Sequence, residues 1–417
     1  MNRIFTALAI VAFAAILAAP AAESASPSGS TSLGDPLAKG NNTFAAQLYR
    51  ELAAKPGNLF FSPYSVSTAL GMAYAGARGQ TAEQIAQALH FQMDQARLNK
   101  AFKRVSKDLL TDARKNGNTL NIADGLSLTG GPVAGQFEAT LKNDYDAELF
   151  SGGVERINAW VRRKTEGRID RIIDQLSPNS VCVILNAIYF KGLWSIPFSK
   201  ELTRNEPFNI SSTKRVTVPL MYRRYKLKML DEKDFQAVSI PYVGNDLSMV
   251  VLLPATTEVL AALEKRMSAA KLGEWLEKLD SRPVREVDLY LPRFTMETSY
   301  DLKPALMKMG MKLPFEKSAD FSGVRTPKGG LWIGQIKHKG FLDVNEKGTE
   351  AAAATAVEMR ALAMRWYPRF RADHPFFFLI RDNRNSMILF MGRETDPRDE
   401  KPDPRSTRRN TKQQPKF

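Results

Sequence analysis

The chain has 417 residues, with 59 lysines and arginines against 44 aspartates and glutamates and a formal net charge of +15. Its 44% hydrophobic and 25% charged residues are typical of a globular protein and exclude a disordered or collagen-like chain. One cysteine and three histidines exclude an internal disulfide, a cysteine-built zinc or iron–sulfur site and a histidine-rich metal centre. We therefore expect no metal.

The first residues are typical of a signal peptide. Arg3 precedes the apolar run 4–17, and the small residues 19–22 follow it. This run is too short for a membrane span, and no later stretch reaches the roughly 18 apolar residues that a spanning helix needs. We predict a signal peptide over 1–22 and an exported protein, extracellular or periplasmic, without a membrane anchor.

The rest of the chain divides into one domain and two flanking segments. Residues 23–39 are predicted to form a flexible leader, and 395–417, rich in proline, lysine and arginine, a disordered basic tail. Between them, 40–394 contains no linker, repeat or shift in composition, which favours a single domain. We expect a monomer with no nucleic-acid partner.

The first third of this domain is predicted to be helical. Apolar residues recur at helical spacing from Phe44 until 55–57, and Ser62-Pro63 is typical of a helix start. Thr81 and Gln84 have the spacing of a capping box and predict the start of a third helix. Further helices are expected near 157–173, 257–278 and 299–310.

Short apolar runs predict β-strands in the later part of the chain. These runs are 183–190, 247–253, 287–291 and 387–391, and their pattern favours strands buried on both faces. Cys182 stands at the start of the first run, so we expect a buried and unreactive thiol. The fold class is therefore α+β with large sheets.

Sequence signs of enzyme chemistry are absent. The chain contains neither a Gly-x-Ser-x-Gly elbow nor a Gly-x-x-x-x-Gly-Lys-Ser/Thr phosphate loop. Asp373 and His374 are adjacent, but consecutive residues of a strand point to opposite faces, so we expect no contact between their side chains. We predict that the chain is not an enzyme.

The segment 348–360 alternates with period two. One set of positions is small or apolar throughout, namely Thr349, Ala351, Ala353, Thr355, Val357 and Met359, whereas the other set carries Glu350, Glu358 and Arg360. Small side chains would meet little steric resistance if this segment entered an existing sheet as a strand. Helix propensity alone favours an alanine-rich surface helix, and a flexible linker is a third interpretation.

Residues 345–355, Asn-Glu-Lys-Gly-Thr-Glu-Ala-Ala-Ala-Ala-Thr, resemble the hinge of a serpin. Residues 58–65, Asn-Leu-Phe-Phe-Ser-Pro-Tyr-Ser, resemble the N-terminal signature of the same family. Other serpin-like motifs follow in order at 76–81, 157–161, 165–169, 185–194, 291–294, 338–339, 370–376 and 388–393. The resemblance covers roughly 40–394, and the order and spacing of the motifs make it specific.

The resemblance implies helices around three β-sheets and an exposed reactive-centre loop at about 345–369. It also implies a suicide inhibitor of serine peptidases. The target cleaves the loop and is held as a covalent acyl-enzyme, while the cut loop enters the main sheet as a new strand. A serpin-fold binding or storage protein that never traps a peptidase is the alternative. The small residues of the hinge favour the inhibitor.

The resemblance also assigns the hinge and the scissile bond. The hinge comprises Glu346, Lys347, Gly348, Thr349, Glu350, Ala351, Ala352, Ala353, Ala354 and Thr355. The usual family spacing, counted from Gly348, places the scissile bond at Leu362-Ala363, which favours a chymotrypsin- or elastase-like target. Counting back from Phe370 gives Met364-Arg365 instead, and cleavage after Arg360 or Arg365 would favour a trypsin-like target.

Three further sets of residues are assigned by the same resemblance. Ser62, Ser65, Asn186 and His338 match the shutter under the main sheet, and Trp194 matches the breach, where the loop first enters. Lys100, Lys103, Arg104 and Lys107 share one helical face in the region where some members bind heparin-like polyanions. A solvated basic face is the alternative interpretation, and the basic run Arg223, Arg224, Lys226 and Lys228 has the same two interpretations. Apart from such a polyanion, no cofactor is expected.

Overall fold

The computed structural model describes residues 35–176, 182–325, 330–347 and 366–398. The helices are α1 (Pro36–Leu52), α2 (Pro63–Gly76), α3 (Gly79–Leu89), α4 (Gln95–Lys115), α5 (Gly135–Tyr145), α6 (Val154–Lys164), α7 (Val259–Arg266), α8 (Ala269–Asp280) and α9 (Lys303–Lys308). The strands are β1 (Leu59–Phe61), β2 (Thr119–Leu128), β3 (Glu148–Phe150), β4 (Cys182–Lys191), β5 (Arg204–Asn209), β6 (Arg215–Asp231), β7 (Phe235–Pro241), β8 (Leu247–Pro254), β9 (Val284–Pro292), β10 (Phe294–Asp301), β11 (Ile333–Val344), β12 (Arg369–Arg371), β13 (Phe376–Asp382) and β14 (Ile388–Glu394). The α+β class expected from the sequence is confirmed.

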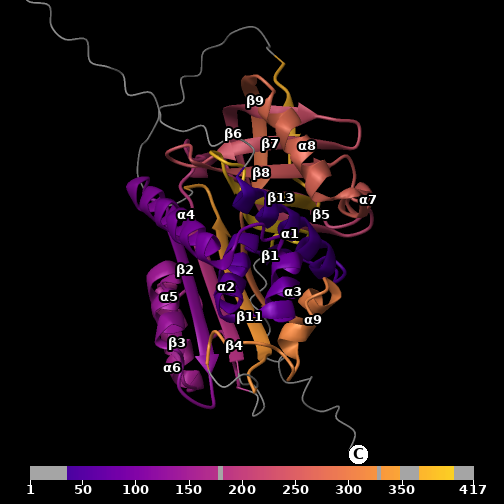
Figure 1. Ribbon diagram of the computed structural model, residues 1–417. Coiled ribbons are helices and arrows are strands. Elements are labelled where there is room, and N and C mark those ends of the chain that lie inside the picture. Colours follow the sequence, from indigo (N-terminus) through magenta and orange to yellow (C-terminus); the bar gives the residue numbers. More distant parts are fainter. Residues whose placement is uncertain (1–34, 177–181, 326–329, 348–365, 399–417) are drawn as a thin grey trace, which may run out of the picture.

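These strands form two hydrogen-bonded sheets. One has five strands in the order β10-β11-β4-β2-β3 and occupies the lower half of the molecule in Figure 1. The other runs β1-β14-β13-β8-β7-β6-β9-β12, with β5 paired to β6, and lies in the upper half. The long strand β6 pairs with β5 and β9 along most of its length and with β7 over its last residues, so it joins two of the three expected sheets into one network.

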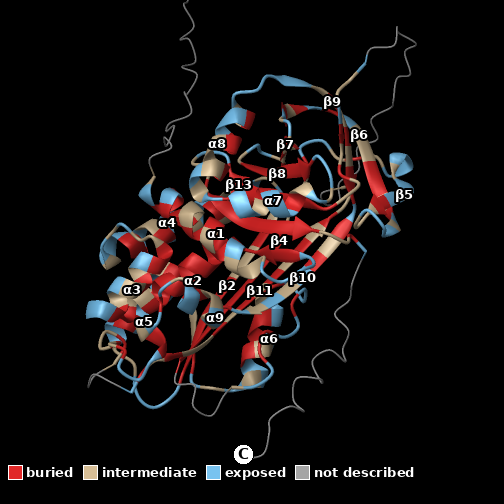
Figure 2. Ribbon diagram, turned by 90° about the vertical axis from the view of Figure 1, so that its right-hand side faces the viewer, coloured by how far each residue is buried: buried red, intermediate tan, exposed pale blue. Residues whose placement is uncertain are grey.

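The core lies where α2 passes between the two sheets. Almost every residue of α2 is buried, and Figure 2 shows it and the strands behind it mainly in red. Phenylalanines from both sheets meet there: the rings of Phe190 on β4 and Phe390 on β14 lie 5.3 Å apart, and those of Phe294 on β10 and Phe378 on β13 lie 5.7 Å apart. Each fully buried side chain of this kind contributes about 1.5–3 kcal/mol to folding.

Two predicted helix starts had different outcomes. Ser62 is the N-cap of α2, as expected, because its Oγ accepts a hydrogen bond from the Ser65 backbone N–H at 3.1 Å. The capping box at Thr81 was wrong, because α3 already begins at Gly79. Thr81 Oγ1 instead accepts from the Asp320 N–H at 2.8 Å, and Gln84 Oε1 accepts from the Leu313 N–H at 2.7 Å. Both side chains therefore hold a distant loop and not their own helix.

Three expected helices are shorter or divided. The helix expected near 157–173 ends at Lys164, because Glu166 and Gly167 adopt positive φ angles. The stretch 257–278 forms α7 and α8, separated where Ser268 caps the second helix. Only α9 forms within 299–310, because the preceding residues pair with β11 as strand β10.

The buried strands follow the prediction in part. β4 and β8 are buried on both faces, whereas β9 alternates and leaves one face partly exposed. Cys182 is buried as expected, and burial raises the pKa of its thiol to about 12. Within the part of the chain that is described, no helix is both long enough and apolar enough to cross a membrane.

Candidate functional site

The two central strands of the five-stranded sheet, β4 and β11, run parallel to each other. Their ladder extends from Cys182 opposite Ile333 to Phe190 opposite Leu342, whereas the neighbours β2 and β10 are antiparallel to them. A segment that left the end of β11 and turned back between these strands would be antiparallel to both. Parallel pairing is slightly less stable per residue than antiparallel pairing, so an entering strand would improve the ladder.

The four residues assigned to the shutter lie together beneath this parallel pair. Asn186 on β4 and His338 on β11 are direct cross-strand neighbours, and the His338 Nδ1 lies 2.5 Å from the Asn186 Oδ1. Asn186 Nδ2 also donates to the Ser65 Oγ at 2.6 Å, and the Ser62 backbone N–H donates to His338 Nε2 at 3.1 Å. Because Nε2 accepts, Nδ1 carries the proton and donates to Asn186. The start of α2 is thus tied to both central strands.

Two further residues, Asp124 and Tyr300, extend the shutter into a row across the sheet. Asp124 on β2 is the cross-strand neighbour of Asn186, and Tyr300 on β10 is the neighbour of His338. Asn186 Nδ2 donates to Asp124 Oδ1 at 2.6 Å. Asp124 was not predicted from the sequence, although an acid between Ala123 and Gly125 in a largely buried strand was a usable signal.

Burial displaces the pKa values of the two titratable groups in this row. It lowers the pKa of His338 to about 3, so the imidazole is neutral at physiological pH. Burial raises the pKa of Asp124 to about 7, against the opposing hydrogen bond from Asn186. The more distant Asp146 raises this pKa further, and Lys164 lowers it. At neutral pH the native sheet therefore holds a buried carboxyl near its midpoint of titration.

The chain is anchored immediately before the hinge glycine. Trp194 is buried, and its indole N–H donates to the Asn345 carbonyl oxygen at 2.9 Å. Its ring stacks on Tyr242 with centroids 4.7 Å apart. Glu346 is also buried, and its Oε1 accepts from the Thr203 hydroxyl at 2.9 Å. Trp194 thus contacts the chain at the point where the loop leaves β11.

The hinge residues beyond this anchor lie outside the described residues, as does the predicted scissile bond. Of the assigned hinge, Glu346 and Lys347 are described, and the Lys347 N–H donates to Asn345 Oδ1 at 3.1 Å. The undescribed residues are Gly348, Thr349, Glu350, Ala351, Ala352, Ala353, Ala354, Thr355, Arg360, Leu362, Ala363, Met364 and Arg365. Their assignment stays a prediction.

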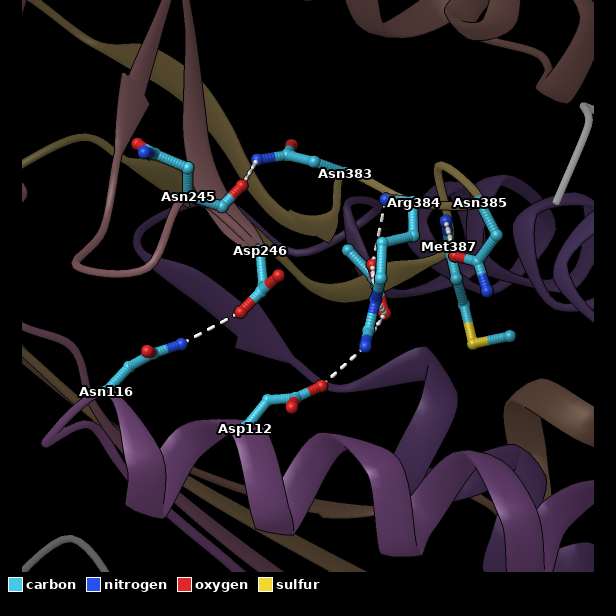
Figure 3. Close-up of polar contacts among 9 residues, drawn as sticks. Asp112, Asn116, Asn245, Asp246, Asn383, Arg384, Asn385 and Met387 are labelled. Carbon is cyan, nitrogen blue, oxygen red and sulfur yellow. Dashed lines mark hydrogen bonds and ion pairs between the residues drawn. The ribbon is translucent and has the colours of Figure 1, made fainter. Parts of the chain in front are cut away.

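The basic residues proposed to bind a polyanion are exposed together on α4. Lys100, Lys103, Arg104 and Lys107 all face solvent, and Lys103 forms an ion pair with Asp144 at 3.3 Å. The C-terminal end of this helix is fixed by polar contacts, which Figure 3 shows. Arg384 binds Asp112, and Asn116 Nδ2 donates to Asp246 Oδ2 at 2.8 Å.

The expectation that Asp373 and His374 do not touch was wrong. Asp373 Oδ1 lies 3.0 Å from His374 Nδ1, because both residues lie in the turn between β12 and β13 and not within a strand. The other ring nitrogen, Nε2, lies 2.8 Å from the Pro254 carbonyl oxygen. Both ring nitrogens therefore have polar partners within the protein. The described residues contain no cluster of acids, histidines and cysteine suited to a metal ion.

Comparisons with known proteins give a consistent result. A family model described as "Serpin (serine protease inhibitor)" matches residues 39–397. Serpin B8 of Homo sapiens is 39% identical over 383 residues, which cover 87% of this chain and all of the relative. The leukocyte elastase inhibitor of Bos taurus is 37% identical and covers 87% of this chain and 99% of its own length.

A solved structure shares the fold. The structure described as Serpin48, a highly specific serpin in the insect Tenebrio molitor, superposes with a TM-score of 0.78 at 31% identity. The match covers 87% of this chain and 98% of Serpin48. The likeness therefore extends over the whole folded domain.

The carboxyl of Asp124 should make the stability of the intact protein depend on pH. Its folded pKa of about 7 lies above its usual value of 3.8, so the stability that it contributes is fully present below pH 3.8 and is lost as the pH rises to about 7. Asp124→Asn removes this loss and keeps the acceptor for Asn186. We expect its advantage over the wild type in free energy of unfolding to grow from pH 5 to pH 8 by on the order of 2 kcal/mol, measured from urea midpoints.

The control for this prediction is Asp170→Asn, which neutralises a carboxyl whose side chain is 76% exposed. Its stability relative to the wild type should change little with pH. Glu394, whose pKa burial raises to about 8, is present in all three proteins and cancels in the comparison. An identical pH dependence in the wild type and Asp124→Asn would contradict the prediction.

Proposed function

The chain belongs to the serpin family and is a serine protease inhibitor rather than an enzyme, and on this basis we propose that it is a secreted, monomeric suicide inhibitor. Its target peptidase cleaves the reactive loop and forms an acyl-enzyme. The cut loop then enters the five-stranded sheet between β4 and β11, and the peptidase stays covalently bound.

The parallel pairing of β4 with β11 is the observation that carries this proposal. The loop leaves the C-terminal end of β11, next to Trp194, so a cut loop that folds back lies antiparallel to both strands. The parallel ladder is then replaced by two antiparallel ones. The small residues Thr349, Ala351, Ala353, Thr355 and Val357 would face the core of the sheet.

The driving force must come largely from side-chain packing and relief of strain. A new strand of about a dozen residues gains hydrogen bonds worth roughly 0.5–1.5 kcal/mol each. Ordering its backbone costs roughly 1–2 kcal/mol per residue. These two contributions nearly cancel. A bulky or charged residue at an inward position would therefore slow insertion enough for the peptidase to complete hydrolysis and escape.

The proposed scissile bond is Leu362-Ala363, and the proposed target is chymotrypsin- or elastase-like. The hinge count gives this bond, and leucine fits the apolar primary pocket of such peptidases. The name of the relative "leukocyte elastase inhibitor" agrees with this class of target. A trypsin-like target would instead require cleavage after Arg360 or Arg365.

The proposal is tested by mixing the protein with chymotrypsin, elastase, subtilisin and trypsin. We expect a covalent complex that survives SDS with at least one of the first two, and a released C-terminal peptide that begins at Ala363. If every peptidase simply cleaves the protein, the suicide mechanism is contradicted. A peptide beginning elsewhere contradicts only the bond assignment.

Two hinge variants provide the matched control. Ala353→Arg places a charged side chain on the inward face of the entering strand, and Ala352→Arg places it on the outward face. The inward variant should convert most encounters into substrate cleavage, raising the number of inhibitor molecules consumed per trapped peptidase by about tenfold or more, since burying an unpaired charge costs several kcal/mol. The outward variant should stay close to the wild type. Equal effects would contradict strand insertion in this register.

We also propose that a sulfated polyanion binds the exposed basic face of α4 and accelerates inhibition. The four clustered cations there, and the polar anchors that fix the end of α4, support this. Dextran sulfate should raise the association rate at low salt, and this effect should fall steeply at high salt. The effect should be lost in Lys100→Gln/Lys107→Gln and kept in Lys226→Gln/Lys228→Gln. A rate indifferent to dextran sulfate would exclude the site.

Secretion is proposed from the first residues alone. Arg3 followed by the apolar run 4–17 and the small residues 19–22 supports export with cleavage after Ala21 or Ala22. The exported protein should therefore begin at Ala22 or Glu23 on N-terminal sequencing. A protein retained in the expressing cells with Met1 in place would contradict this proposal.

A further inference from the structure

A partly exposed strip of arginines and tyrosines lies at the C-terminal end of the reactive loop. It consists of Tyr222, Arg224 and Lys226 of β6, Tyr290 of β9, and Arg369 and Arg371 of β12. These positions alternate with buried residues such as Tyr225, Leu289 and Phe370, so the strip is the outward face of the three strands. β6 and β9 lie at the upper end of the molecule in Figure 1. The proposed trapping mechanism uses none of these side chains.

Strand register arranges the strip in two rows. In the first row, Arg369, Asp288 and Arg224 are direct cross-strand neighbours, and Arg224 Nε donates to Asp288 Oδ1 at 3.0 Å. In the second row, Arg371, Tyr290 and Tyr222 are neighbours. The rings of Tyr290 and Tyr222 lie 4.7 Å apart.

Stacking holds the arginines of the strip in place. The Arg224 guanidinium lies 3.9 Å from the centroid of the Tyr367 ring, and the Arg371 guanidinium lies 4.9 Å from that of Tyr290. A guanidinium stacked on an aromatic ring keeps N–H donors available at its edge. Side chains that are already ordered lose less entropy when a partner binds. The strip is thus preorganised for contact.

The composition of the strip is that of a protein interface. Arginine, tyrosine and tryptophan are enriched among the residues that dominate binding energy. Trp366, the first described residue after Lys347, is 87% exposed and directly precedes Tyr367, on which Arg224 stacks. Arg224 is paired with Asp288, and Arg371 with Glu206 and Asp373. Among the described residues Lys226 and Arg369 form no ion pair, although Glu286 is the cross-strand neighbour of Lys226. These two cations can bind carboxylates of a partner, which favours an acidic partner surface.

The target peptidase is the partner within reach. Arg369 lies six positions after Ala363, an extended distance of at most about 22 Å. A peptidase of about 230 residues has a radius of gyration of about 17 Å, so an enzyme seated on the Leu362-Ala363 bond extends over the strip. We propose that the strip is a second binding surface for the target peptidase and favours peptidases with acidic side chains beside the cleft. This inference rests on the proposed function.

The test measures binding before any covalent step. Anionic and cationic isoforms of one chymotrypsin-like peptidase are inactivated by replacing the catalytic serine with alanine, and their association rate and Kd are measured at about 0.05 and 0.3 M salt. Lys226→Glu/Arg369→Glu should slow association of the anionic isoform by about tenfold or more at low salt, and should leave the cationic isoform unchanged or faster. Lys226→Gln/Arg369→Gln should give a smaller effect in the same direction.

The matched control is Lys142→Glu/Arg163→Glu, which makes the same change in net charge at exposed positions of α5 and α6. It should alter association with either isoform by less than about threefold. The proposal would be overturned if both charge-reversed variants lost the same association rate with the anionic isoform, or if Lys226→Glu/Arg369→Glu bound it like the wild type. It would also be overturned if Lys226→Glu/Arg369→Glu lost only its binding to dextran sulfate, because the strip would then be a polyanion surface.

The suicide mechanism is tested separately, by looking for SDS-stable complexes with the active isoforms. If binding depends on the strip but no covalent complex forms, the suicide mechanism is contradicted and the strip is supported as a binding surface. If covalent complexes form at rates that the strip variants do not change, the mechanism stands and the strip proposal fails. Wild-type protein that binds neither inactive isoform contradicts the strip directly.

Discussion

The parallel ladder between β4 and β11 is the constraint on which the rest of the structure depends. It places two strands side by side whose outer neighbours are already antiparallel to them, so the sheet can accept one further strand without rearranging its edges. A direct side-chain hydrogen bond, from His338 to Asn186, also crosses this boundary in the shutter. Opening the sheet here separates these two groups while Asn186 keeps its contacts to Asp124 and Ser65.

The polar row under the ladder holds the native sheet closed at a cost. Buried polar groups stabilise a fold when each has a partner, and Asn186, His338 and the two serines satisfy one another. Asp124 differs, because its hydrogen-bond donor is a neutral amide, and burial penalises its charged form. The native sheet is therefore destabilised as this carboxyl ionises, which fits the proposed mechanism, in which the sheet opens. At the two ends of the loop, Trp194 binds the Asn345 carbonyl oxygen and β12 pairs with β9.

Much of the fold could be predicted from local pattern. Apolar runs predicted β4, β8 and β14, and Ser62-Pro63 predicted the start of α2. The apolar pattern of a buried strand and the capping of a helix both depend on residues close together in the sequence. The wrong predictions share one cause: the residues concerned bind partners that are distant in the sequence. Thr81 and Gln84 bind the loop at 313–320 and not the ends of their own helix, and 299–301 pairs with β11 where helical spacing predicted a helix. Asp373 and His374 touch because a turn, which strand periodicity cannot indicate, places them together.

The sequence by itself determined the family, through motifs in a specific order and spacing, and the resemblance to that family assigned the four shutter residues. Only the tertiary structure decided that Asp124 and Tyr300 complete the row, that Trp194 binds Asn345 across 151 residues, and that the basic run on β6 joins β12 in an arginine–tyrosine strip. The physical reason is register: which residues become cross-strand neighbours depends on how whole strands align, and no spacing within one segment carries that information.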